Sequence, residues 1–282
     1  MKVREITDKI EKRIPRQAAL EWDNVGLLLG DFDWDVHRIY IALDATDRVI
    51  DHAVESGADM IITHHPMLYS PIRSVTADDF VGRRIMKLIK HKIAYYAMHT
   101  NYDVCEMGDL AADTLGMTGL KTLDVSYDGS DIDAVEAAGD GTDAISPIRI
   151  STSMGIGKVG ETGDAIAPNL RDYAKRVKEA FGLSHVCVFG DPEREVHRVA
   201  ICPGSGKSEL GLALEAGADT YVSGDIDHHT GIDAVAQGLA VIDAGHYGIE
   251  HIFIEHMAMT LRAQLAQVDV LTEPMREPVW LV

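Results

Sequence analysis

The stretch "RIYIALDATDRVIDHAVESGADMIITHH" (residues 38–65) decides the fold. It contains an apolar run, then a segment with helical periodicity, then a second apolar run. Thr46 is well suited to cap the N-terminus of the helix, and Gly57 is well suited to end it. A strand, a helix and a strand in this order predict a βαβ unit, in which the two strands are parallel.

Strands and helices alternate along most of the remaining chain. This alternation predicts an α/β fold with largely parallel sheets. The further predicted elements are a helix at 78–91, a strand at 92–98 and a helix at 107–116; after a break they are strands at 197–204, 219–225 and 239–244, and helices at 208–218, 230–238 and about 246–268.

The break at 124–147 is strongly acidic. It contains six Asp, one Glu and no Lys or Arg, a composition that keeps a loop solvated. A cation site there would have no recognisable ligand spacing. We therefore predict a first α/β lobe at 1–124, an acidic connector with a small insert at 125–180, and a second α/β lobe at 181–282.

The two predicted lobes are related in sequence. Residues 39–65 align with residues 199–225 at a constant offset of 160. The pattern Ala-x-Glu-x-Gly-Ala-Asp occurs without a gap at 53–59 and again at 213–219. Each lobe then reaches a strand that is followed by a His-x-x-x-acid motif. These matches predict an internal duplication that gives two pseudo-symmetric lobes.

Three groups of potential metal ligands follow predicted strands. In an α/β protein, ligands bind beyond the carboxyl ends of parallel strands, and these ends share one edge of a sheet. Imidazole and carboxylate groups together suit Zn, Mn, Fe or Ni. The three groups are His64 with His65, His99 with Asp103, and His246 with Glu250.

Local geometry favours more than one ion. Pro66 forces His65 into an extended conformation, in which the side chains of His64 and His65 point in different directions. Two ions, or one ion with one supporting histidine, fit this arrangement. His246 and Glu250 are one helical turn apart and so lie on one helix face.

Two glycine-rich motifs are poor candidates for nucleotide sites. "GSGKS" (204–208) lacks the first glycine of a P-loop, because Ile201 stands at that position. It still allows a tight turn whose N–H groups could meet an anion. "GIGKVG" (155–160) fits a dinucleotide motif, but no helical pattern follows it. The basic residues 83, 84, 87 and 90 lie along one predicted helix as a solvated face.

The composition excludes several classes of protein. The chain has 26 basic and 45 acidic residues, a net charge of −19, which repels the phosphates of nucleic acids and anionic lipids. Its three cysteines form no metal-binding pair. We find no signal peptide and no apolar run of about 18 residues. The sequence predicts a soluble, cytoplasmic protein.

The sequence resembles the Nif-three-like dinuclear metal-centre family, whose members are also described as GTP cyclohydrolase 1 type 2 homologues. The family's motifs occur in order over nearly the whole chain. They are "EWDNVGLLLG" (21–30), "ITHHPMLYSPIRSV" (62–75), "MHTNYD" (98–103), "GIGKVGE" (155–161), "SGDIDHHTGIDA" (223–234) and "VIDAGHYGIE" (241–250).

This resemblance implies a two-lobed α/β fold that holds two divalent ions, with Zn, Fe or Mn as candidates, and that assembles as a homohexamer. The larger domain inserted in some members is absent. Asp103 and Glu250 are candidates to bridge the ions. The implied metal ligands are His64, His65, Asp103, His246 and Glu250, and the implied nearby site residues are His99 and His229.

The expected function is metal-dependent hydrolysis of a small molecule such as a nucleotide. Water activated by the ions would attack a nucleotide ring or a phosphoester, and His99 or His229 would transfer protons. The alternative is a non-enzymatic metal-binding or regulatory protein that acts through partners. The apolar residues Ile249, Phe253 and Met257 recur every four positions, which predicts either a subunit interface or a helix deep in the core.

Overall fold

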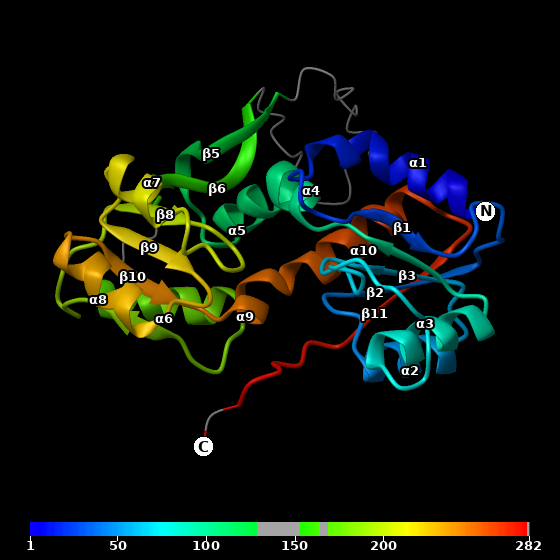
Figure 1. The fold of residues 1–282 in the computed structure, drawn as a ribbon. Coiled ribbons are helices and arrows are strands. Elements are labelled where there is room, and N and C mark those ends of the chain that lie inside the picture. The colour runs from blue at the N-terminus through cyan, green and yellow to red at the C-terminus, as the bar shows by residue number, and fades with distance from the viewer. Residues whose placement is uncertain (129–152, 164–168, 281) are drawn as a thin grey trace. The chain divides into compact units, whose positions relative to one another are not determined.

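The computed structural model describes residues 1–128, 153–163, 169–280 and 282 (Figure 1). The chain divides into two compact units. Within the described residues, unit 1 comprises Met1–Tyr102 and Phe253–Met275, and unit 2 comprises all the others. The domain boundaries expected at 124 and 180 stay a prediction, and most of the acidic break, from residue 129 to 147, lies outside the described residues.

Unit 1 is built on a five-stranded sheet with the order β1-β4-β3-β2-β11. Strands β11, β2, β3 and β4 are parallel neighbours, and β1 is antiparallel to β4. The elements are α1 (Val3–Arg13), η1 (Arg16–Ala18), β1 (Gly26–Leu29), β2 (Arg38–Ala42), α2 (Asp47–Glu55), β3 (Met60–Thr63), α3 (Phe80–Lys90), β4 (Ala94–Ala97), α4 (Thr100–Tyr102), α10 (Ile252–Gln264) and β11 (Asp269–Thr272).

Helices cover both faces of this sheet, so its central strands are apolar on both sides. Helices α2 and α3 cover the face of Tyr95. Helix α1 lies on the opposite face (Figure 1), where the hydroxyl of Tyr96 donates to Glu11 of α1 at 3.3 Å. Thr46 caps α2 by accepting from the Val49 N–H, and Gly57 follows the helix at φ +70°. The predicted βαβ unit is confirmed.

Unit 2 is built on a six-stranded sheet with the order β5-β6-β8-β9-β10-β7. Strands β8, β9 and β10 are parallel, as expected, and antiparallel strands extend the sheet on both sides. The elements are η2 (Asp103–Met107, a π-helical turn), α5 (Gly108–Thr114), β5 (Thr118–Asp128), β6 (Ser153–Glu161), α6 (Leu170–Ala180), β7 (Cys187–Phe189), β8 (Arg198–Ile201), α7 (Leu210–Glu215), β9 (Thr220–Ser223), α8 (His228–Ala236), β10 (Ala240–Asp243) and α9 (His246–Glu250).

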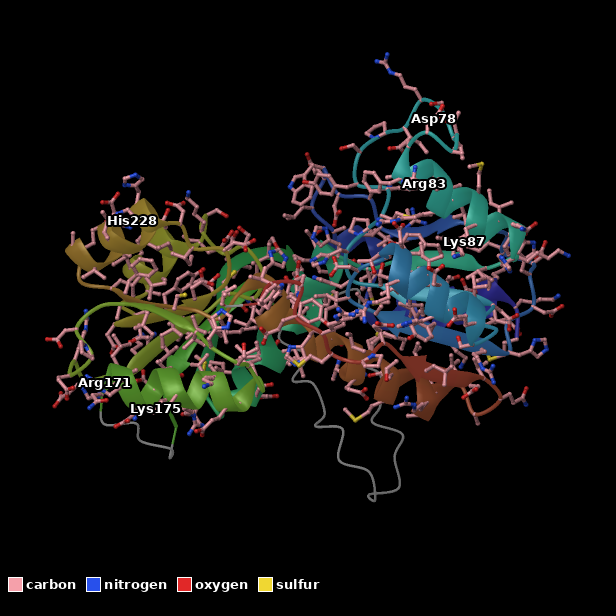
Figure 2. All side chains as sticks on the ribbon, turned by 90° about the horizontal axis from the view of Figure 1, so that it is seen from below. Asp78, Arg83, Lys87, Arg171, Lys175 and His228 are labelled. Atoms are coloured by element: carbon pink, nitrogen blue, oxygen red, sulfur yellow. The ribbon has the colours of Figure 1, made fainter. Side chains whose placement is uncertain are left out.

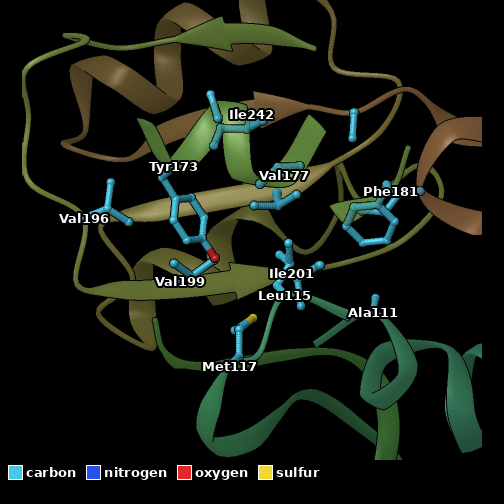
Figure 3. Close-up of a cluster of buried hydrophobic side chains, with 14 of the residues drawn as sticks. Ala111, Leu115, Met117, Tyr173, Val177, Phe181, Val196, Val199, Ile201 and Ile242 are labelled. Atoms are coloured by element: carbon cyan, nitrogen blue, oxygen red, sulfur yellow. The ribbon is translucent and has the colours of Figure 1, made fainter. Parts of the chain in front are cut away.

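The core of unit 2 lies between its sheet and helices α5 and α6. Tyr173 and Val177 of α6, and Phe181 directly after it, pack toward Val199 and Ile242 of the sheet (Figure 3). A second cluster under α7 and α8 fills the other face. The motif "GIGKVG" lies within strand β6, which agrees with its rejection as a dinucleotide site.

The internal duplication is confirmed by strand register. Strands β2 and β3 pair in the register that β8 and β9 use 160 residues later. Asp59 accepts hydrogen bonds from the backbone N–H groups of His37 and Arg38. Asp219, the equivalent residue, accepts from those of His197 and Arg198. The first strand of each repeat therefore begins with the same backbone hydrogen bonds to an aspartate carboxylate.

The predicted helix at 246–268 is two helices, α9 and α10, with His251 between them. The apolar faces of α10 are mostly buried, including Phe253, Met257 and Leu261. Burial within the chain accounts for the apolar pattern, so the pattern does not require a subunit interface.

Candidate metal centre

Unit 1 brings three histidines together at the carboxyl ends of two strands. His64 and His65 follow β3, and His99 follows β4. Their ring centroids are 4.9 Å (His64–His65), 5.3 Å (His64–His99) and 5.7 Å (His65–His99) apart. One nitrogen of each ring lies within 4.8 Å of one nitrogen of the other two. His64 is buried, and the other two are partly exposed.

Each of these imidazoles makes a hydrogen bond through Nδ1 to an acceptor oxygen. Carbonyl and carboxylate oxygens only accept, so each Nδ1 carries the proton and the lone pair of the neutral ring lies on Nε2. Histidines that bind metals are held in this way. The acceptors are Met98 O for His64 (2.9 Å), Asp44 Oδ1 for His65 (2.8 Å) and Asp23 Oδ1 for His99 (2.9 Å).

Asp23 fixes His99 from a fully buried position. Its second oxygen accepts from the N–H of Thr100 at 2.9 Å and from the hydroxyl at 2.6 Å. Burial raises the pKa of Asp23, but the hydrogen bonds from His99 and Thr100 outweigh it and lower the pKa to about 2. A stable carboxylate therefore locks the 20–24 segment to the start of α4.

Unit 2 holds the remaining three predicted ligands. Asp103 begins the π-helical turn η2, and His246 and Glu250 lie on α9, which follows β10. His246 Nε2 lies 3.1 Å from Glu250 Oε2, and one oxygen of Asp103 lies within 4.8 Å of one oxygen of Glu250. Asp225 accepts from His246 Nδ1 at 2.7 Å, the kind of carboxylate contact that orients a metal-binding imidazole.

The backbone around these residues is specialised. Asp225 has φ +57°, a left-handed conformation that Asp tolerates better than most residues. Gly204 has φ +76°, and a Cβ atom there would clash with the carboxylate of Glu250. A glycine is therefore needed where β8 ends, so that Glu250 fits beside it.

The two repeats use equivalent positions differently. At the offset of 160, His65 of the first repeat corresponds to Asp225 of the second, and Asp44 corresponds to Gly204. In the first repeat His65 supplies an imidazole, which Asp44 holds. In the second repeat the equivalent residue, Asp225, supplies instead the carboxylate that holds the imidazole of His246. The duplicated scaffold has therefore diverged at its strand ends.

The donor chemistry fits a divalent ion of the Zn, Mn or Fe type, which imidazole and carboxylate ligands suit. The two buried cysteines do not compete, because burial raises the pKa of Cys105 to about 12 and raises that of Cys202. His229 is exposed on α8 and belongs to none of the three-residue donor groups found among the described residues. Its role stays a prediction.

Helix α3 carries basic residues that pair with acids of α2. Arg84 Nε donates to Asp47 at 2.6 Å, and Lys87 pairs with Asp51. Arg83 and Lys87 stand one helical turn apart on α3 (Figure 2). The interpretation as a solvated face holds for Arg83 and Lys90, which are exposed, whereas Arg84 and Lys87 are partly buried against the acids of α2.

Fold and site together define a duplicated α/β protein with clustered imidazole and carboxylate donors. The chain belongs to the Duf34/NIF3 (NGG1p interacting factor 3) family, whose sequence model matches residues 1–278. A relative from Clostridium acetobutylicum, named GTP cyclohydrolase 1 type 2 homolog, is 33% identical over 274 residues, which are 96% of this chain and 94% of the relative. A Streptococcus pneumoniae relative with the same name is 33% identical over 264 residues, which are 91% of this chain and 89% of the relative.

Solved structures have the same fold. A Bacillus cereus protein related to NIF3 matches with a TM-score of 0.87 at 24% identity, covering 100% of this chain and 99% of that one. A Staphylococcus aureus hypothetical protein matches with a TM-score of 0.85 at 29% identity and the same coverage. Within the described part of the chain, no helix has the length and apolar character of a membrane span.

Proposed function

We propose that this protein is a metal-dependent hydrolase that binds two divalent ions per chain and acts on a small molecule such as a nucleotide. One observation carries the proposal: four histidines, at positions 64, 65, 99 and 246, each have Nδ1 held by an acceptor oxygen. This is the arrangement of a metal-binding imidazole.

The proposed ligands are His64, His65, Asp103, His246 and Glu250. His64 and His65 belong to unit 1, and Asp103, His246 and Glu250 belong to unit 2.

Divalent ions bound there would supply Lewis-acid activation and lower the pKa of water. The chain's own contribution to proton transfer is His99. Asp23 holds its Nδ1, so Nε2 is the atom that accepts a proton and then returns it. The nucleotide as substrate rests on the relatives' name, GTP cyclohydrolase 1 type 2 homolog. The family resemblance also supports a cytoplasmic homohexamer, which light scattering can test.

A substrate panel tests the hydrolase. Purified protein loaded with Zn, Mn, Fe or Mg would be assayed against nucleotides and phosphoesters, with and without a chelator. We expect saturable turnover of at least one compound, loss of turnover with the chelator, and recovery on adding metal. A protein that binds two ions but turns over none of the panel would contradict the hydrolase and favour a regulatory metal-binding protein.

The carboxylates that hold the histidines should control metal affinity. We expect Asp44→Asn and Asp225→Asn each to weaken binding of Zn or Mn by about 10- to 100-fold, because the imidazole loses its orienting negative charge. Asn is the suitable replacement because it tolerates the left-handed backbone of Asp225. Competition with a metal-sensitive dye measures the affinity. The exposed Asp8→Asn is the control, and unchanged affinity in both test variants would rule out this role.

A further inference from the structure

Two large aromatic side chains are exposed beside the histidines of unit 1. Trp22 is 56% exposed and Tyr69 is 59% exposed. Their ring centroids are 5.9 Å apart, and the ring planes are tilted by 59°. The ring of Trp22 also lies 6.0 Å from that of His99, in an edge-to-face arrangement. The aromatic pair is thus continuous with the donor cluster.

These rings stand on a rigid base. The side-chain amide of Asn24 donates to Leu68 O at 2.6 Å, which ties the segment of Trp22 to the segment of Tyr69. The neighbouring Asp23 is anchored to His99 and Thr100. Both rings stay more than half exposed although their backbone is held in place, and such pre-organisation favours binding of a partner ring.

We propose that Trp22 and Tyr69 form a stacking platform for a planar, neutral heteroaromatic ring of the substrate. The proposal rests on the proposed function and gives that site a substrate class. Tilted rings make an open corner in which one ring stacks on a ligand's face and the other meets its edge. Because the ring of Trp22 is next to that of His99, substituents of a ligand ring stacked on Trp22 would reach the donor cluster.

Electrostatics favour a neutral ring over an anionic group on this platform. The chain carries a net charge of −19, which repels anions that no metal ion neutralises. Stacking on an aromatic side chain is insensitive to this charge, and every nucleobase has a face that can stack. The platform would therefore bind the ring of the substrate and leave any anionic part to the ions.

Fluorescence provides a direct test, because Trp22 can be made the sole tryptophan. The chain has three tryptophans, and the double variant Trp34→Phe with Trp280→Phe leaves Trp22 as the reporter. Metal-free protein would be titrated with guanosine, adenosine, cytidine and nicotinamide, and with ribose as a control without an aromatic ring. We expect saturable quenching by at least one ring compound and none by ribose. No saturable quenching by any ring up to millimolar concentration would overturn the proposal.

Variants in the otherwise native chain then locate the binding site by equilibrium dialysis. We expect Trp22→Leu and Tyr69→Leu each to weaken binding of the quenching compound about tenfold, which corresponds to about 1.4 kcal/mol. Trp22→Phe and Tyr69→Phe keep an aromatic ring and should stay within about threefold. Trp280→Leu, which removes an equally large exposed ring elsewhere, should leave affinity unchanged.

Unchanged affinity in Trp22→Leu would also overturn the platform. If the oligomeric mass changed at the same time, these rings would contact another subunit and not a ligand. The readout needs neither metal nor turnover. If the protein stacks a ring but hydrolyses nothing, the platform is upheld and the hydrolase is contradicted. If it turns over a substrate but stacks no ring, the hydrolase is upheld and the platform is contradicted.

Discussion

Replacing Glu250 with glutamine is expected to lower the bound divalent metal from about two ions per chain to one or fewer, while the chain stays folded. The Glu250 side chain is only 4% exposed and lies 3.1 Å from His246 Nε2 and close to Asp103. A carboxylate in this position neutralises charge on both proposed ions. Glutamine keeps its size and removes that charge. Elemental analysis after dialysis against trace Zn or Mn measures the content, and circular dichroism reports the fold.

His251→Gln is the matched control, one position along the chain. His251 Nδ1 donates to Gly248 O at 2.9 Å, and its ring stacks on Tyr247, so it lies outside the donor groups and its replacement should leave metal content unaltered. Equal content in wild type and Glu250→Gln would refute the bridging role. Wild-type protein that stays metal-free after loading with Zn or Mn would refute the centre itself.

The parallel strands β2, β3, β4, β8, β9 and β10 could be predicted because their signals are local, whereas β11, which is parallel to β2, was not predicted. Apolar runs of four or five residues alternate with amphipathic helices, and Thr46 and Gly57 mark where one helix begins and ends. The repeat at an offset of 160 then related the two units. Strands β5, β6 and β7 escaped prediction because β5 and β7 are largely exposed and β6 is rich in glycine, so none shows a strong apolar pattern.

The prediction of one long helix at 246–268 was wrong. The apolar periodicity continues through His251, although the regular helix is interrupted there. The periodicity reports which residues are buried, and both α9 and α10 bury theirs. An interruption of one residue between two buried helices does not change such an apolar pattern, so the sequence does not reveal it. The expectation that all ligands follow one sheet edge was also too simple, because the ligands follow strands of two sheets.

The site divides into residues that sequence could identify and residues that it missed. His64, His65 and His99 were identifiable because each lies within two residues of an apolar strand, and Asp103, His246 and Glu250 were identifiable from the His-x-x-x-acid motif. Asp23, Asp44 and Asp225 were missed, because each acts across the fold on a histidine 76, 21 and 21 residues away, respectively. A usable signal did exist for two of them: Asp44 follows β2 and Asp225 follows β9, and each of these strands neighbours the strand that precedes its histidine.

Removing the Glu273 carboxylate is expected to lower the free energy of unfolding of unit 1 by about 3 kcal/mol. Glu273 is 4% exposed and follows β11. Its oxygens accept from Tyr40 at 2.6 Å and from His52 at 2.9 Å, and they pair with Arg48 at 3.1 Å. Glu273→Ala would leave the Tyr40 hydroxyl buried without its acceptor. Arg48 and His52 are more than one-third exposed and can rehydrate, which keeps the loss at the lower end of the range for broken buried pairs.

Urea unfolding in a Trp280→Phe background measures this loss in unit 1 alone, because Trp22 and Trp34 both belong to that unit. Glu273→Gln keeps an oxygen that accepts from Tyr40, so its expected loss is smaller, about 1 kcal/mol. Glu55→Ala removes a carboxylate from an exposed position of α2 and should change stability by less than about 0.5 kcal/mol. If Glu273→Ala cost no more than Glu55→Ala, this buried network would be a consequence of the packing around β11 and not a cause of its stability.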